Sequence, residues 1–193
     1  IQQLDMIRPE QAWVSDITYI RTRKGFMYLS LITDVYSKKI MAYELSDSLK
    51  TEGSLRALNK AIRNRNYRNK PLIHHSDRGF QYCSPIYTQA LESNNVSISM
   101  TTKYDPYENA VAERVNGILK NEFLLDQTFY NEKHAQKEVR CTIEAYNNLR
   151  PHLSCHYLTP NQAHHLGNYK LKKWSNRAFK KQSSIKEKNV LLN

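Results

Sequence analysis

Residues 104–123 read Tyr-Asp-Pro-Tyr-Glu-Asn-Ala-Val-Ala-Glu-Arg-Val-Asn-Gly-Ile-Leu-Lys-Asn-Glu-Phe, a turn that opens onto a helix. The Asp-Pro pair favours a turn, and the residues after it repeat with the period of an α-helix. One helical face is apolar and holds Val111, Val115 and Ile118. The opposite stripe holds Glu113, Asn116, Gly117 and Lys120. The sequence therefore predicts a helix that packs through one side and turns a carboxylate toward a cleft or solvent.

Two further carboxylates lie where a sheet is expected. Asp77 precedes Glu113 with 35 residues, 78–112, between them, and it comes just after the short apolar run 71–75. The end of a buried strand is where α/β folds place functional side chains. Asp16 lies inside 12–20, a run rich in β-branched and aromatic residues. Because carboxylates repel one another and resist burial, three together need a compensating cation.

Each acid also has an ordinary structural interpretation. Asp16 fits the exposed face of an edge strand, and Asp77 fits a turn. Glu113 fits a solvated helix face that it shares with Lys120. Gly117 argues against the last interpretation, because glycine inside a helix costs about 1 kcal/mol relative to alanine and can mark a close approach. The acids are therefore informative as a set rather than singly.

The periodicity of the chain predicts an α/β fold with a mixed five-stranded sheet flanked by helices. The expected strands are 12–20, 26–33, 39–45, 71–75 and 96–100. The first three follow one another through short connections, which predicts an antiparallel meander. The expected helices are 51–64, 84–93, the one after the turn at 105–109, 132–148 and 160–165. Beyond residue 166 no clear period remains.

Composition places the chain among ordinary globular proteins. Of its 193 residues, 40% are hydrophobic and 24% charged, and one domain with a tail is the simplest expectation. No run approaches the roughly 18 apolar residues that span a bilayer, so no membrane partner is expected. The start, without Met or signal-peptide features, is typical of a cut fragment. Three cysteines without a Cys-x-x-Cys pair predict a reducing, cytoplasmic setting.

The charge balance indicates a polyanionic partner. Twenty-nine Lys and Arg against 18 Asp and Glu give +11, which makes nucleic acid the first candidate. Residues 166–193 hold eight basic residues and one acid, so a plain basic tail accounts for much of the excess. A second basic run spans 56–70 and is interrupted by Tyr67. It suits phosphate contacts with a stacking aromatic, or else a solvated basic face.

Histidines give little support for a structural zinc site. His152, Cys155 and His156 lie close together, but no two-cysteine motif stands at finger spacing. The motif Arg150-Pro151-His152 has no role that the sequence assigns.

Several motifs together resemble one family closely. They are Trp13-Val-Ser-Asp-Ile-Thr-Tyr-Ile20, Gly25 through Asp34, His75-Ser-Asp-Arg-Gly-Phe-Gln-Tyr82, Tyr107-Glu-Asn-Ala-Val-Ala-Glu113 with Lys120, Asn148-Leu-Arg-Pro-His152, and Leu158-Thr-Pro160. In this order and spacing the chain resembles the catalytic domain of bacterial insertion-sequence transposases of the retroviral-integrase-like group. The resemblance is to the second-frame protein of the insertion-sequence-three family, and it covers roughly residues 10–165.

The resemblance implies an RNase H-like fold of the retroviral integrase catalytic core superfamily. It implies that Asp16, Asp77 and Glu113 are the catalytic, metal-binding acids. The implied cofactor is Mg²⁺, with Mn²⁺ as substitute, in two ions. The implied partners are DNA, both element ends and target, and further copies of the chain assembled on DNA. The DNA-facing residues would be Asn116 and Lys120 on the helix, with Arg63, Arg65 and Arg68 from the basic run.

The resemblance also implies the domain plan and the reaction. The plan is a catalytic core over 1–150 and a C-terminal extension with a basic tail over 151–193, without the family's N-terminal helix-turn-helix. One departure is Glu108, where the family has Asp. The expected activity is metal-dependent DNA strand cleavage and strand transfer. The alternatives are a nuclease that only hydrolyses and a non-catalytic DNA-binding or assembly module.

The turn 105–109 is expected to order only with metal or DNA. Until then, Glu113 would lie apart from the other two acids.

Overall fold

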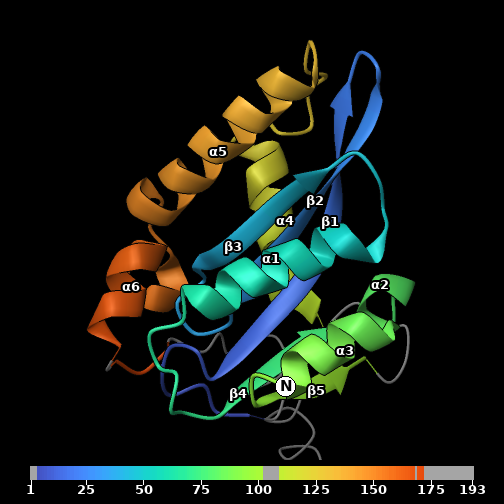
Figure 1. Ribbon diagram of the computed structural model, residues 1–193. Helices are drawn as coiled ribbons and strands as arrows, with labels where there is room; N and C mark the ends of the chain where they lie inside the picture. The colour runs from blue at the N-terminus through green and yellow to red at the C-terminus, as the bar shows by residue number, and fades with distance from the viewer. Residues whose placement is uncertain (1–3, 102–108, 168, 172–193) are drawn as a thin grey trace, which may run out of the picture.

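The computed structural model describes residues 4–101, 109–167 and 169–171. Its centre is a five-stranded sheet in the order β3-β2-β1-β4-β5 (Figure 1). β1, β2 and β3 form the antiparallel meander, and β4 and β5 run parallel to β1. The strands are Ala12–Thr22, Gly25–Asp34, Ile40–Ser46, Leu72–Ser76 and Val96–Met100. The mixed five-stranded sheet expected from the sequence is confirmed.

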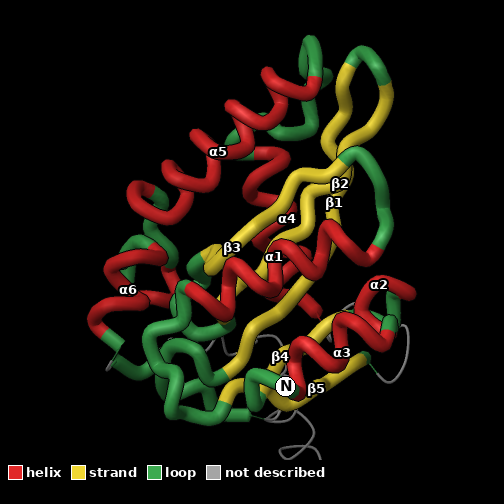
Figure 2. Tube along the Cα trace, in the orientation of Figure 1, coloured by secondary structure: helices red, strands yellow, loops and turns green. Residues whose placement is uncertain are grey.

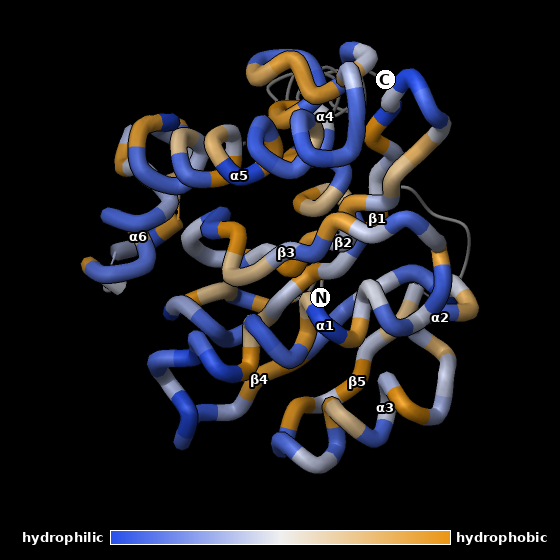
Figure 3. Tube along the Cα trace, turned by 45° about the horizontal axis from the view of Figure 1, so that its top comes forward, coloured by the Kyte–Doolittle hydropathy of each residue, from blue (hydrophilic) through white to orange (hydrophobic). Residues whose placement is uncertain are grey.

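Helices cover both faces of this sheet. α1 (Thr51–Arg63) and α3 (Pro85–Glu92) lie on one face, and α4 (Ala110–Asn121) with α5 (Glu132–Leu149) on the other (Figure 1). The short α2 (Phe80–Cys83) precedes α3, and α6 (Pro160–Leu166) follows α5. α1 and α5 alternate hydrophilic and hydrophobic residues along their length (Figure 3), as expected for amphipathic helices that pack on a sheet.

Two apolar cores separate the helices from the sheet. One joins β1 and β2 to α4 and α5 and contains Ile20, Leu29, Val115, Ile118 and Val139. The other packs α1 and α3 against the opposite face and contains Trp13, Ile32, Leu58, Tyr87 and Leu91. The apolar face predicted for the helix after residue 109 is thus the face that packs.

The connection between α4 and α5 is fixed to the β1–β2 hairpin (Figure 2). Phe129 donates its N–H to the carbonyl of Arg21 at 2.9 Å and accepts from the N–H of Arg23 at 3.0 Å. Phe129 itself is buried. Two backbone hydrogen bonds therefore tie the segment after α4 to the end of the β1–β2 hairpin.

A buried polar cluster fastens α6 to the rest of the fold. The carboxylate of Glu10 accepts the backbone N–H groups of Asn66 and Tyr67 at 2.8 and 2.9 Å. His164 of α6 places Nε2 3.3 Å from the same carboxylate, and Arg65 places Nε 3.6 Å from it. These contacts join the N-terminal segment, the loop after α1 and the segment after residue 150. The domain boundary near residue 150 stays a prediction.

Two features differ from the sequence-based expectation. α2 was not predicted, because four residues are too few to show a helical period. A 3-10 turn, η2 (Leu153–Cys155), was also not predicted. Among the described residues, no helix combines the length and the hydrophobicity needed to cross a bilayer.

Candidate active site

Asp16 lies on β1, on the sheet face that α4 covers, since it alternates with the neighbouring residues and shares its side with Ile20. Its Oδ1 accepts the N–H of Ile17 at 2.8 Å, and its Oδ2 accepts Nδ2 of Asn116 at 2.6 Å. Burial raises the pKa of Asp16 to about 6, and the negative charges of Asp77 and Glu113 act in the same direction. Asp16 is therefore a half-buried carboxylate on which the charges of two other acids act.

Asp77 follows β4, the parallel neighbour of β1. The paired positions end with Val14 opposite His75, and two residues further along both strands stand Asp16 and Asp77. Neighbouring strands are separated by about 4.8 Å, and positions at equal register share a face. Asp77 is exposed, and its Oδ1 accepts the N–H of Gly79 at 2.9 Å. Asp77 therefore forms the turn that its sequence context suggested, and it also follows the strand next to the one that carries Asp16.

Glu113 belongs to a helix face that is held against β1. Asn109, directly before α4, donates Nδ2 to the carbonyl of Ser15 at 3.2 Å, and Asn116 reaches Asp16. Glu113 is four residues after the first of these and three before the second, so it shares their side of the helix. Its side chain is exposed. The helix thus points Glu113 toward the end of the sheet where both aspartates lie.

The three acids influence one another without forming a closed metal cage. Within residues 4–101, 109–167 and 169–171, no three or more His, Cys, Asp or Glu side chains are grouped closely enough to hold a metal ion. The charges of Asp77 and Glu113 nevertheless raise the pKa of Asp16. The turn expected to order with metal or DNA falls at 105–109, and its first four residues lie outside the described residues.

Asn116 is placed differently from the sequence-based expectation. It was expected to face DNA, but only 8% of it is exposed, and its amide is bound to Asp16. The side of α4 opposite its apolar face therefore contacts β1 through Asn116 and is not wholly exposed to solvent. Lys120 is partly exposed on the same stripe. A Cβ added at Gly117 would meet nothing within 4 Å, so no described part of the protein requires glycine there.

A buried histidine supports the two aspartate-bearing strands. His74 of β4 places Nε2 2.6 Å from the hydroxyl of Ser15 on β1 and 3.0 Å from that of Tyr87 on α3. Burial lowers the pKa of His74 to about 3, so the ring is neutral and can accept a hydrogen bond from a hydroxyl group. This network fixes the register next to Asp16. The sequence placed His74 beside the site without revealing these partners.

Two arginines of the basic run 56–70, Arg65 and Arg68, bind other groups of the protein. Arg65 was expected to contact DNA, but it is 7% exposed and faces the buried carboxylate of Glu10, so its role is structural. Arg68 is exposed, yet its guanidinium donates to the carbonyls of Arg63 and Arg65 at 3.0 and 3.2 Å.

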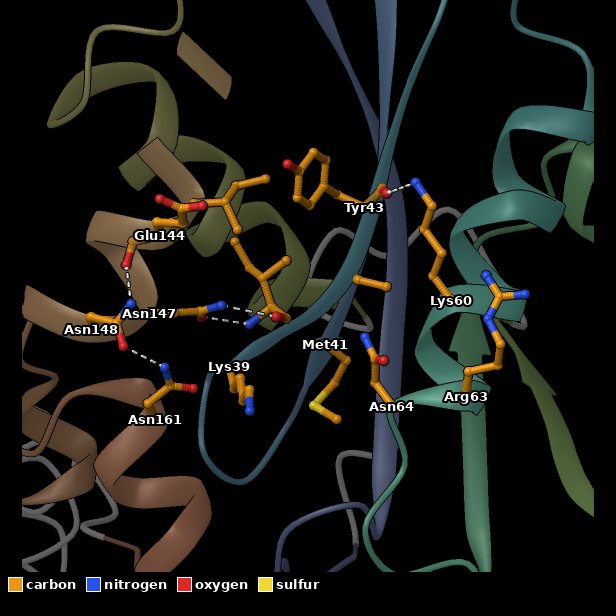
Figure 4. A pocket seen from close by; sticks show the side chains of 13 residues that line it. Lys39, Met41, Tyr43, Lys60, Arg63, Asn64, Glu144, Asn147, Asn148 and Asn161 are labelled. Carbon is orange, nitrogen blue, oxygen red and sulfur yellow. Dashed lines mark hydrogen bonds between the residues drawn. The ribbon is translucent and has the colours of Figure 1, made fainter. Parts of the chain in front are cut away.

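Arg63 is exposed and lines a groove of about 520 Å³ between α1, the edge strand β3 and α5 (Figure 4). Lys60 lies beside it and donates to the carbonyl of Tyr43 at 3.4 Å. On the far side, Asn147 bonds both the N–H and the carbonyl of Ile40 at 3.0 Å. The groove is thus separate from the three acids, and only Arg63 of the three predicted arginines lines it.

The chain matches the model described as integrase core domain over residues 7–106, and a second model of that description over residues 94–160. It is 36% identical over 143 residues to the transposase for insertion sequence element IS629 of Shigella sonnei, covering 74% of this chain and 48% of that protein. It is 35% identical over 155 residues to the transposase InsF for insertion sequence IS3A of Escherichia coli strain K12, covering 80% and 54%. The chain spans about half the length of these relatives.

Solved structures share the fold. The HTLV-2 integrase catalytic core domain in complex with magnesium, in its trimeric form, gives a TM-score of 0.64 at 22% identity, covering 82% of this chain and 98% of that one. A chain of the simian T-cell lymphotropic virus intasome in complex with the PP2A regulatory subunit B56 gamma gives 0.71 at 20% identity, covering 90% and 61%. The fold is thus that of a retroviral integrase catalytic core, which is RNase H-like.

Proposed function

The chain belongs to the integrase core domain family, and from this premise we propose that it is the catalytic part of an insertion-sequence transposase. Its activity would be DNA strand cleavage at element ends followed by strand transfer. The relatives at 35–36% identity are transposases by name, which supports the choice of substrate. The partners we propose are element ends, target DNA and further copies of this chain assembled on DNA, acting in the cytoplasm. The retroviral relatives are described in dimeric, trimeric and intasome forms.

The observation that carries the proposal is that the charges of Asp77 and Glu113, from two other elements, act on the half-buried carboxylate of Asp16. Asp16 lies on β1, and Asp77 follows the end of β4, each two residues past the last paired position of the two strands. Glu113 shares the side of α4 that Asn116 joins to Asp16. Burial is the largest cause of the raised pKa of Asp16, and the negative charges of Asp77 and Glu113 add to it. A structural acid would normally find a cation or leave the sheet face. Among the described residues none of these three carboxylates forms a salt bridge, and such a set is suited to a bound cation.

The donor set fits divalent metal. Carboxylate oxygens are the hard ligands that Mg²⁺ and Mn²⁺ prefer, and we propose that Asp16, Asp77 and Glu113 hold two such ions. When bound, the metal supplies Lewis-acid stabilisation of the charge that develops on the scissile phosphate. The chain's own contribution is orientation. Asn116 fixes one oxygen of Asp16, and Asn109 fixes the start of α4 on β1.

The proposed reaction is in-line attack on a phosphodiester, first by water to expose a 3′-OH and then by that hydroxyl on a second strand. Neither step requires a covalent enzyme intermediate. We propose that Lys120, partly exposed on the stripe of Glu113, contacts a phosphate of the DNA with its ammonium group. A nuclease that only hydrolyses would share the same three acids, and strand joining on a pre-cut end separates the two activities. A non-catalytic DNA-binding or assembly module would show neither.

The test is cleavage and joining of labelled element-end DNA in the presence of Mg²⁺ or Mn²⁺. Asp77→Asn and Glu113→Gln each remove one proposed metal ligand and are expected to abolish both activities. Glu92→Gln, at the exposed end of α3, removes one carboxylate charge elsewhere and is expected to leave both unchanged. Undiminished activity in Asp77→Asn or Glu113→Gln would refute the assignment.

A further inference from the structure

The motif Arg150-Pro151-His152, to which the sequence assigned no role, forms one wall of a pocket. The pocket has a volume of about 520 Å³ and lies between the first turns of α4 and the segment after α5. Cavities of roughly 300–1,000 Å³ are typical of small-molecule sites. Much of the wall is apolar and is formed by Val111, Val115, Pro151 and Leu153. Such a wall can accept a flat, apolar group.

The pocket also gathers positive charge, of which one guanidinium is free. Lys38, Arg114 and Arg150 line it. Arg150 is held by Glu122 through two bonds of 2.7 Å, and Lys38 donates its ammonium to the carbonyl of Val35. The side chain of Arg114 is exposed, and no side-chain hydrogen bond or ion pair joins it to another residue that the structure describes. An anionic group entering the pocket would therefore meet an uncommitted cation.

His152 provides an unsatisfied polar group in the same wall. It is 8% exposed, and its Nε2 has no hydrogen-bond partner among the described residues. Buried polar atoms without a partner are uncommon and costly, about 1–3 kcal/mol each. Burial, together with the charges of Arg150 and Lys38, lowers the pKa of His152 to about 4. The ring is thus neutral at pH 7.

An aromatic ring stands at the rim of the pocket. Tyr157 lines it and is 68% exposed. The backbone that carries the ring is unusual, since His156 and Tyr157 have φ of 56° and 62°, a left-handed conformation that is costly for side chains other than glycine. The N–H of Tyr157 donates to the carbonyl of His152 at 2.9 Å. The ring is therefore presented from a fixed turn rather than from a loose loop.

We propose that this pocket binds one unstacked nucleotide of a DNA strand, with the base against the apolar wall and Tyr157 and the phosphate at Arg114. Bases stack on aromatic side chains while arginine meets the backbone in single-strand sites. A groove along α4 is lined by Glu113 and Arg114 and shares Arg114 with the pocket. A strand passing Glu113 can thus reach the pocket. The inference rests on the proposed function only in taking DNA as the ligand.

The experiment is fluorescence anisotropy of a short labelled thymidine oligonucleotide titrated with the full chain in EDTA. Tyr157→Ala and Arg114→Gln are each expected to raise the Kd about 5- to 100-fold. Tyr157→Phe keeps the ring and is expected to bind like the wild type. The matched controls are Tyr130→Ala, at 62% exposure near the β1–β2 hairpin, and Arg140→Gln, exposed on α5, and both are expected to bind like the wild type.

A second arm identifies the chemical group in the pocket. An oligonucleotide with abasic sites is expected to bind the wild type as weakly as the normal one binds Tyr157→Ala. If Tyr157→Ala and Arg114→Gln bind like the wild type, or if abasic DNA binds with unchanged affinity, the inference is overturned. Equal competition by polyglutamate would overturn it too. Because EDTA excludes strand cleavage, this result is independent of the activity of Asp77→Asn, so the two proposals fail separately.

Discussion

Asn116 on α4 donates a hydrogen bond of 2.6 Å to Asp16 on β1. The two residues are 100 positions apart in the chain, and the bond joins the helix that carries Glu113 to the strand that carries the first acid. It also uses one carboxylate oxygen of Asp16 in a fixed direction. The other oxygen accepts the N–H of Ile17. The orientation of this carboxylate is therefore set by the protein itself.

Replacing Asn116 by alanine is expected to lower metal-dependent strand cleavage about 10- to 100-fold, the usual cost of losing a residue that orients a metal ligand. The measurement is the initial rate of cleavage of end DNA at several Mg²⁺ concentrations. Asn94→Ala, exposed in the turn after α3, is the control and should cleave like the wild type. An Asn116→Ala enzyme with the wild-type rate would show that this bond does not position the acid.

Replacing Gly117 by alanine should stabilise the fold and weaken the binding of DNA. Alanine is favoured over glycine by about 1 kcal/mol inside a helix, and an added Cβ would meet nothing within 4 Å. Gly117→Ala should therefore raise the free energy of unfolding by about 1 kcal/mol in urea titrations. The same variant should bind end DNA more weakly, because the methyl group stands on the stripe of Glu113. Unchanged DNA affinity would mean that DNA does not approach α4 at this residue.

Arg65 and Arg63 should differ in how much each contributes to the free energy of unfolding. Removing Arg65 leaves the fully buried carboxylate of Glu10 with fewer partners, so Arg65→Ala should lower the free energy of unfolding by about 3 kcal/mol. Arg63 is exposed, and Arg63→Ala should change stability by less than about 0.5 kcal/mol. Denaturant titration of both variants measures the difference. Equal stabilities would contradict the structural role of Arg65.

His164 makes stability depend on pH. Burial disfavours its charged form, but the carboxylate of Asp34, 3.8 Å away, and the hydrogen bond with Glu10 outweigh burial and raise the pKa of His164 above its usual 6.5. A raised folded-state pKa contributes stability that is complete below about pH 6.5 and is lost as the pH rises through the folded-state value. The urea concentration at the unfolding midpoint should therefore decrease as the pH rises above about 6.5. His164→Asn should flatten this slope, whereas His165→Asn, its exposed neighbour, should keep it.

The strands and most helices could be predicted because their signals are local. β-branched alternation marked β1 to β3, and helical spacing marked α1, α4 and α5. The positions of Asp16 and Asp77 followed from the same signals, since one lies in a strand and the other at a strand end. A local sequence signal does not indicate which distant residue a side chain will contact in the folded protein.

Two site residues illustrate this limit. Periodicity separates the two stripes of α4 but does not say which stripe meets β1, so Asn116 was expected to face DNA and instead binds Asp16. Arg65 was expected to bind DNA because it stands in a basic run, yet its partner Glu10 lies 55 positions earlier. The pocket beside α4 needed both the turn after residue 150 and the helix in place. Only the folded chain brings these segments together.

The central claim is that Asp16, Asp77 and Glu113 together hold divalent metal, and locating that metal tests it most directly. The measurement is anomalous scattering from Mn²⁺ in crystals of the chain soaked with MnCl₂, with and without end DNA. The account predicts manganese about 2.2 Å from oxygens of all three carboxylates, and no such peak in Asp77→Asn crystals. Manganese bound elsewhere, or a wild-type peak that persists in Asp77→Asn, would contradict it.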